Sequence, residues 1–174
     1  IVIVVIGVLS TMMMLSSTEA VSSAKANNIV SNLRNWKTAT LAWYVDNIDR
    51  VNNKGQVKKG DSFTNFGGSG VTMEIAKYLN NEFTADGSDG RFIKDSSNGR
   101  YYVDHKAVGS DKLRWFIGYE MPTNDTRLQK KLEDRAQSVG LYSKYYNGDL
   151  EGTYTASSHT PRCVCIEIID FSKN

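Results

Sequence analysis

The apolar residues of this chain are concentrated at its N-terminal end. Twelve of the first fifteen residues are Ile, Val, Leu or Met, and no charged residue occurs before Glu19. A helix that crosses a bilayer needs about 17 to 25 predominantly apolar residues, so residues 1–18 are just long enough. They lack the basic start and the small-residue cleavage site of a signal peptide. The pattern predicts a helix that is apolar on every side, which must be buried in lipid or against other helices.

The pattern changes from apolar to amphipathic after this segment. Residues 21–51 contain neither Pro nor Gly, and apolar or small residues recur every three or four positions, which places them on one helical face. The members of this face are Ile29, Leu33, Trp36, Thr40, Tyr44, Ile48 and Val51. The opposite face carries Asn27, Arg34, Asn35, Lys37 and Asp46. We expect one rod of about 50 residues, roughly 75 Å long, of which only the second half rests on a head.

Two further helices are predicted in the rest of the chain. Residues 52–70 are rich in Asn, Lys, Gly, Asp and Ser, which favours a loop. A short helix is predicted at residues 71–80. A longer one is predicted at residues 124–139, with Thr123 or Asn124 as its cap, Leu128, Leu132, Ala136 and Val139 as its apolar stripe, and Gly140 as its terminator.

Strands are predicted on both sides of Asn98-Gly99, at residues 113–120 and at residues 162–171. The predicted fold is therefore α+β: a long N-terminal α-helix, whose apolar first half projects, with a small antiparallel β-sheet head packed on its C-terminal half. This divides the chain into an apolar membrane or filament-core segment (1–24), an amphipathic helix packed on the head (25–51) and a globular α+β head (52–174).

The first ten residues, IVIVVIG followed by VLS, resemble the N-terminal signature of type IV pilins and pseudopilins, and Gly7 matches the glycine inside the apolar helix of that family. The similarity covers about the first 30 residues. Two features depart from the family pattern. The opening residues of the family, including a glutamate, would precede Ile1, and Leu15 stands where many relatives have a helix-breaking proline.

This resemblance implies that the chain is the major structural pilin of a bacterial extracellular filament, serving adhesion, twitching motility or DNA uptake. It implies a subunit that is stored in the inner membrane, trimmed by a prepilin peptidase, methylated, and extracted by the pilus assembly machinery into a helical homopolymer. The residues expected to pack in the filament core are Ile1, Val2, Ile3, Val4, Val5, Ile6, Gly7, Val8, Leu9, Met12, Met13, Met14 and Leu15. We also expect unwinding between Gly7 and Thr18 in the fibre, because glycine, serine and threonine lower helix propensity there.

Two other functions compete with this reading. One is a pseudopilin of a type II secretion system, and the other is a membrane-anchored periplasmic binding module that does not polymerise. An enzyme is not expected, because the two histidines lie outside any nucleophile motif. The net charge of +2 is too small to predict specific binding of nucleic acid.

A few residues remain as candidates for chemistry. Glu19 either marks the membrane surface or pairs across subunits with a base such as Lys25. Asp86 and Asp89 in a turn are weak calcium candidates, without the EF-hand pattern, so no cofactor is predicted. Cys163 and Cys165 are expected to be two thiols on one face of a strand, because a bridge between residues i and i+2 would be strained.

The sequence also contains a candidate zinc set and a formal glycosylation acceptor. Both cysteines, with His105 and His159, offer a zinc set of unusual spacing. Asn124 formally begins a glycosylation acceptor, but we expect it to cap a helix instead.

Overall fold

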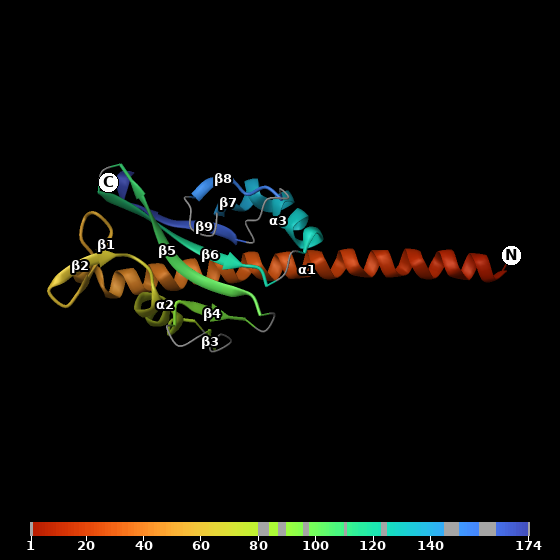
Figure 1. The fold of residues 1–174 in the computed structure, drawn as a ribbon, viewed down its shortest axis with the longest axis horizontal. Helices are drawn as coiled ribbons and strands as arrows, with labels where there is room; N and C mark the ends of the chain where they lie inside the picture. The colour runs from red at the N-terminus through yellow and green to blue at the C-terminus, as the bar shows by residue number, and fades with distance from the viewer. Residues whose placement is uncertain are drawn as a thin grey trace.

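Helix α1 (Val2–Asp46) is the longest element of the fold. The computed structural model describes residues 2–79, 84–86, 90–95, 98–109, 111–122, 125–144, 150–156 and 163–173, and the side chains before Ser17 lie outside this description. The first part of α1 extends beyond the head, and the second part lies along the head (Figure 1). In this single chain the helix is continuous from Gly7 to Thr18. The unwinding expected in a fibre therefore stays a prediction.

The predicted apolar face is confirmed except at Ile48, and Tyr44 and Val51 are partly buried against the core. Its buried members are Ile29, Leu33, Trp36 and Thr40. Ile48 was wrongly assigned to this face, because the helix ends at Asp46 and the helical spacing no longer applies. The Asn47 side chain donates to the carbonyl oxygen of Trp43 (2.9 Å) at this end, and a single 3-10 turn, η1 (Ile48–Arg50), follows. Ile48 is consequently exposed.

The head is built on a seven-stranded antiparallel sheet, so the predicted small sheet is wrong in its size. The strand order is β3-β4-β5-β6-β9-β7-β8. These strands are β3 (Thr84–Asp86), β4 (Phe92–Lys94), β5 (Arg100–Val108), β6 (Lys112–Glu120), β7 (Leu141–Lys144), β8 (Leu150–Thr153) and β9 (Cys163–Asp170). Strands β4, β5, β6 and β9 were predicted. The other three are too short for an alternating pattern to reveal them, and β4, which is equally short, was predicted because Asn98-Gly99 indicated a turn after it.

The turn between β4 and β5 forms where Asn98-Gly99 predicted it. Asn98 has a φ of 61°, a left-handed conformation that asparagine tolerates better than most residues. The Asp95 side chain accepts a hydrogen bond from the Gly99 amide (3.0 Å). The turn is thus held by Asn98 and Gly99, the two residues that predicted it, and by the Asp95 carboxylate.

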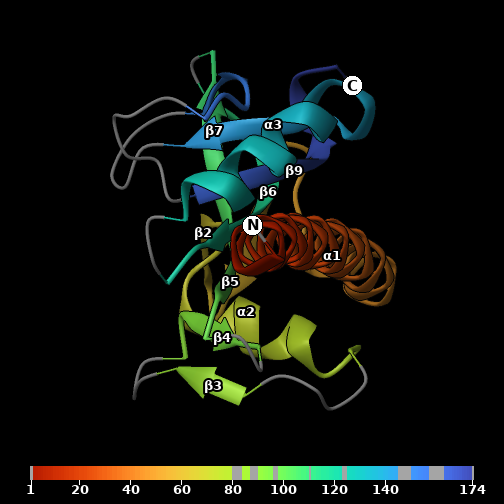
Figure 2. The same cartoon turned by 90° about the vertical axis from the view of Figure 1, so that its right-hand side faces the viewer.

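Two shorter helices lie on opposite sides of α1 when the molecule is viewed along that helix (Figure 2). Helix α2 (Ser69–Ala76) occupies part of the predicted range, and α3 (Thr126–Val139) ends at Gly140 as predicted, with a φ of 75°. The predicted cap of α3 was wrong. Asp125 is the cap, because its Oδ1 accepts from the Leu128 amide (3.0 Å), and residues 123–124 lie outside the described part of the chain.

The predicted loop at residues 52–70 contains a two-stranded hairpin, so that prediction was wrong. Its strands are β1 (Gln56–Lys59) and β2 (Ser62–Asn65), joined by Gly60-Asp61. Gly60 has a φ of 62°, as a two-residue hairpin turn requires. The Gly60-Asp61 pair is typical of a hairpin turn, but the residues around it are mostly polar and do not show the pattern of a strand.

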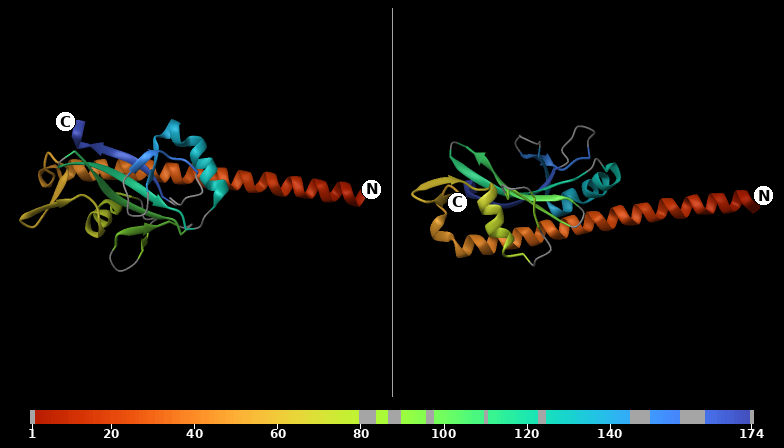
Figure 3. Two further views of the ribbon diagram at one scale, coloured as in Figure 1. Left: turned by 45° about the horizontal axis from the view of Figure 1, so that its top comes forward. Right: turned by 60° about the horizontal axis from the view of Figure 1, so that its bottom comes forward.

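The main core is an aromatic cluster between α1 and one face of the sheet, along which α1 runs (Figure 3). Trp36 stacks on Tyr101, with ring centroids 6.1 Å apart. Trp43 lies against Trp115 (6.3 Å), and Trp115 stacks on Phe66 (3.8 Å). The indole of Trp115 also donates to the Gly55 carbonyl (2.7 Å). These contacts fix the direction of α1 relative to the sheet.

The other face of the sheet carries a smaller cluster of Tyr102, Phe116 and Cys165. Cys163 and Cys165 are buried thiols two residues apart on β9, which confirms that they share one face of a strand. Burial raises the pKa of Tyr102 well above its ordinary value, and the two nearby cysteines add to this shift. The Tyr102 ring lies over Gly118, where any Cβ would overlap it.

We therefore expect Gly118→Ala to lower the free energy of unfolding by about 1 to 3 kcal/mol, because the buried tyrosine must move out of its packed position. Urea unfolding followed by tryptophan fluorescence measures this loss. Gly152→Ala is the matched control, since a Cβ there meets nothing within 4 Å. Equal stabilities of the two variants would contradict the role of Gly118.

Asp170 joins the end of β9 to β6 and to the 3-10 turn η2 (Phe171–Lys173). Its carboxylate accepts from Arg114 Nη2 (2.8 Å) and from the Ser172 hydroxyl (2.6 Å) and amide (3.0 Å). Burial alone would raise the pKa of Asp170, but the hydrogen bonds from Ser172 and Arg114 outweigh it and hold the pKa below its ordinary value. The folded state therefore takes up this proton less readily than the unfolded chain does.

Acidification should therefore remove the stabilising contribution of the ionised Asp170 carboxylate, which is fully present at neutral pH. We expect Asp170→Asn to lower the free energy of unfolding by about 1 to 3 kcal/mol at pH 7. The difference from the unmodified chain should shrink as the pH falls below about 4. Urea titrations at pH 7 and pH 3 measure both values, with the exposed Asp61→Asn as control. A deficit that is the same at both pH values would count against this role of the carboxylate.

Candidate functional site

The candidate site is the surface of α1 that the head leaves uncovered. Residues 17–21 are exposed, and Ser22 is the first buried residue along the described side chains. We call residues 2–21 of α1 the stem. In Figure 1 the stem stands clear of every strand and of both other helices. Its sequence is the apolar segment, so an apolar helix projects from a folded head.

The stem leaves the head at a point where α3 holds α1 by polar contacts. The guanidinium of Arg135 donates to Asn27 Oδ1 (3.1 Å), to Ser23 Oγ (3.0 Å) and to the Lys131 carbonyl (2.6 Å). Ser22 and Ala26 are buried next to these contacts. The small side chains let the two helices approach closely, which fixes the exit of the stem.

The other end of α1 is held by α2. The Trp43 indole donates to Glu74 Oε2 (3.0 Å), and Arg50 Nη1 contacts the same oxygen (3.2 Å). The Tyr78 hydroxyl donates to Asp46 Oδ2 (2.9 Å), and this hydrogen bond is the main cause of the raised pKa of Tyr78. The rod is thus anchored at both ends of its embedded half.

The exposed surface of this half carries the charged residues Lys25, Arg34 and Asp46, but near its C-terminal end two aliphatic side chains, Leu41 and Val45, are also exposed, and Ile48 follows in η1. We call Leu41, Val45 and Ile48 the outer stripe. Their exposed fractions are 37%, 67% and 59%. Between the outer stripe and the stem the exposed residues of α1 are mixed, and they include Ala24, Asn27, Ser31 and Arg34. A group of neighbouring exposed aliphatic residues is a feature of surfaces that bind another chain.

The predicted site residues are distributed as follows. The side chains of the predicted filament-core residues lie outside the described part of the chain. Glu19 and Lys25 are both exposed on α1, so their pairing between subunits stays a prediction. Within the described residues, no helix combines the length and the apolar character that a membrane span needs.

The weak calcium site is not assembled by the described residues. Asp86 on β3 is engaged by Lys94 (2.7 Å) and Arg100 (3.7 Å), and Asp89 lies outside the described part of the chain. His105 on β5 contacts the Phe66 carbonyl (2.6 Å), and His159, the other histidine of the candidate zinc set, lies outside the described part of the chain. No group of three metal-ligating side chains occurs among the residues that the structure describes.

Sequence reasoning missed a hollow beside the exit of the stem. It is lined by Lys25 and Asn28 of α1, by Asp95 after β4, and by Met121, Asp125 and Leu128 around the start of α3. These residues come from three distant segments, so no local pattern could have indicated them.

Comparison with protein-family models, with curated proteins and with solved structures gives no match for this chain. The functional assignment therefore depends on its own residues.

The hydrogen bond between Trp43 and Glu74 gives a test of how the embedded half is held. Trp43 is almost fully buried, so Glu74→Ala would leave its indole without this acceptor. We expect a loss of about 1 to 3 kcal/mol in the free energy of unfolding. Arg50→Ala should cost less than about 1 kcal/mol, because the Arg50–Glu74 ion pair is partly exposed. Urea unfolding compares the two, and an equal or reversed order would contradict this assignment.

Proposed function

We propose that this chain is the structural subunit, the major pilin, of a bacterial type IV pilus-like extracellular filament. In this proposal the stems of many copies pack together in the centre of the fibre and the heads form its surface. The chain acts by assembly rather than by catalysis. Before assembly it is stored in the inner membrane, and in the filament it serves adhesion, motility or DNA uptake.

The observation that carries this proposal is the projection of an apolar helix from a head that does not cover it. Exposed apolar surface is unfavourable in water by roughly 25 cal/mol per Å², so a stem of this composition needs another apolar environment. A bilayer and a bundle of identical stems both supply one. A helix satisfies its own backbone hydrogen bonds in either, so transfer between the two is nearly balanced.

The way the head holds α1 also supports assembly. A subunit whose stem pivoted freely could not repeat one geometry along a fibre. The contacts of Arg135 with Ser23 and Asn27, and of Glu74 with Trp43, fix the helix at both ends of its embedded half. The outer stripe then supplies an apolar surface, at a defined position on this rod, for the stem of another copy.

The central experiment uses the full chain purified in detergent. Removal of the detergent without added lipid should give long, sedimentable fibres visible by electron microscopy, whereas a chain without residues 1–21 should remain a soluble monomeric head. A full chain that forms no fibres when the detergent is removed, together with cells that make no filament containing it, would overturn the proposal. A membrane-anchored module predicts that outcome.

The outer stripe gives a sharper prediction. Val45→Glu should leave the head folded, because Val45 is mostly exposed, but should reduce the sedimented fraction at least about tenfold. The reason is that a carboxylate in an apolar helix contact lacks a partner. Sedimentation after detergent removal measures the effect, and Gln137→Glu, an exposed site on α3, is the matched control. Fibres at normal yield from Val45→Glu would exclude the stripe from the contact.

A further inference from the structure

The β1–β2 hairpin presents an unusual pair of side chains. Lys58 lies directly opposite Phe63 in the antiparallel register, so the two share one face of the hairpin. Phe63 is 47% exposed, and Lys58 is exposed as well. The opposite face carries Val57, which is buried in the head. An aromatic ring and an ammonium group therefore stand together on a surface that this chain does not cover.

The hollow beside the stem has the complementary chemistry. It measures ≈ 80 Å³, and apolar side chains that include Ile29, Met121 and Leu128 line it. Two carboxylates, Asp95 and Asp125, also line it, against a single base, Lys25. Asp95 accepts from the Gly99 amide and Asp125 from the Leu128 amide, so both are held in place. The hollow thus combines an apolar wall with an excess of negative charge.

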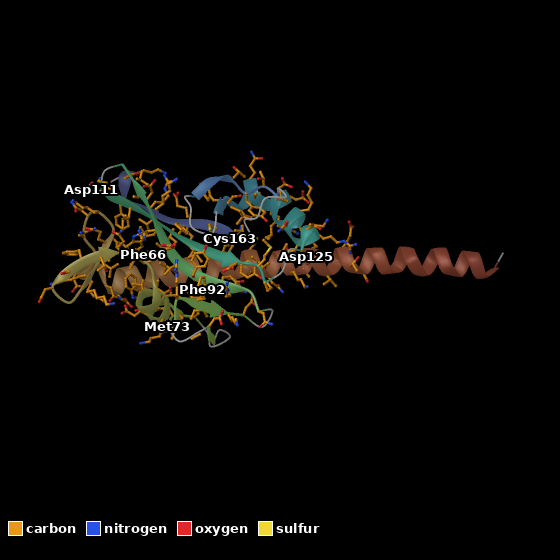
Figure 4. All side chains as sticks on the ribbon, in the orientation of Figure 1. Phe66, Met73, Phe92, Asp111, Asp125 and Cys163 are labelled. Carbon is orange, nitrogen blue, oxygen red and sulfur yellow. The ribbon has the colours of Figure 1, made fainter. Side chains whose placement is uncertain are left out.

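The hairpin and the hollow lie at opposite ends of the head. Figure 4 shows Asp125 at the end from which the stem leaves, and Asp111 at the far end. Lys54, next to β1, forms an ion pair with Asp111 (2.5 Å), which fixes the hairpin to that far end. Eighteen helical residues separate Asn28 from Asp46, or about 27 Å. The hairpin of one chain therefore cannot reach its own hollow.

We propose that the β1–β2 hairpin of one subunit docks in the hollow of the next, with Phe63 against the apolar wall and Lys58 beside Asp95 and Asp125. This inference rests on the proposed function, because it supplies the contact between heads along the filament. The two surfaces differ, so the contact is heterologous. A heterologous contact that does not close into a ring propagates without limit, which is the symmetry of a fibre.

Cross-linking tests the contact directly. The full chain with Asn65→Cys and Asn28→Cys, assembled and then oxidised, should give a ladder of covalent oligomers on a non-reducing gel, because Asn65 shares the hairpin face of Phe63 and leaves both Phe63 and Lys58 in place. A chain with Ser62→Cys and Asn28→Cys is the control, because Ser62 lies opposite Lys59 on the other face of the hairpin. Normal fibres without a ladder, or with equal ladders from both variants, would overturn this contact and leave the filament proposal intact. No fibres from the unmodified chain would overturn both.

Charge reversal supplies an independent test. Lys58→Glu should raise the concentration at which fibres form about tenfold, because it places a third carboxylate beside Asp95 and Asp125. Lys59→Glu makes the same change of charge one position away on the opposite face, and should have little effect. Asn28→Lys should restore assembly of the Lys58→Glu chain. Equal effects of the two reversals, or no restoration, would argue against the docking of this hairpin face.

Discussion

The structure depends on one constraint: α1 is a single continuous helix, of which one half packs on the head and the other half, the stem, extends beyond it. The embedded half of α1 follows the rule of a surface helix, with Leu33, Trp36 and Trp43 buried against the sheet and a polar face outside. The stem has no polar face in its sequence. Because the backbone hydrogen bonds continue through Ser22, a change in the direction of one half is transmitted to the other.

The aromatic core fixes the orientation of α1 relative to the sheet. Trp36 and Trp43 lie two turns apart on α1 and contact different parts of the sheet, Tyr101 in one case and Trp115 in the other. Two such contacts prevent rotation of the helix about its axis as well as tilting. Leu41 and Val45 on the same rod are therefore presented at a fixed angle, so that in the proposed filament a partner helix would meet the same surface on every copy.

The sequence predicted those parts of the fold in which a local pattern decides the structure. Helical spacing located α1 and α3, and the Asn98-Gly99 pair located the β4–β5 turn. The missed elements were short or polar: β3, β7, β8 and the β1–β2 hairpin owe their order to neighbours distant in the chain. The hollow was unpredictable for the same reason, because Lys25, Asp95 and Asp125 converge only after folding. The cap of α3 was predicted one or two residues too early, since Thr123, Asn124 and Asp125 are adjacent polar residues that all suit that position.

The two proposed contacts are geometrically consistent with each other. Consider two parallel subunits, with the hairpin of the lower one docked in the hollow of the upper one. Residues 25–28 of the upper subunit then lie level with the hairpin of the lower subunit, near Asp46 at the end of the lower α1. The two helices are then offset by about twenty residues, or about 30 Å. This offset sets Val21 of the upper stem, which is 54% exposed, level with Leu41 in the outer stripe of the lower subunit. One axial shift thus covers apolar residues at both places, so the contact between heads and the contact between helices favour the same register.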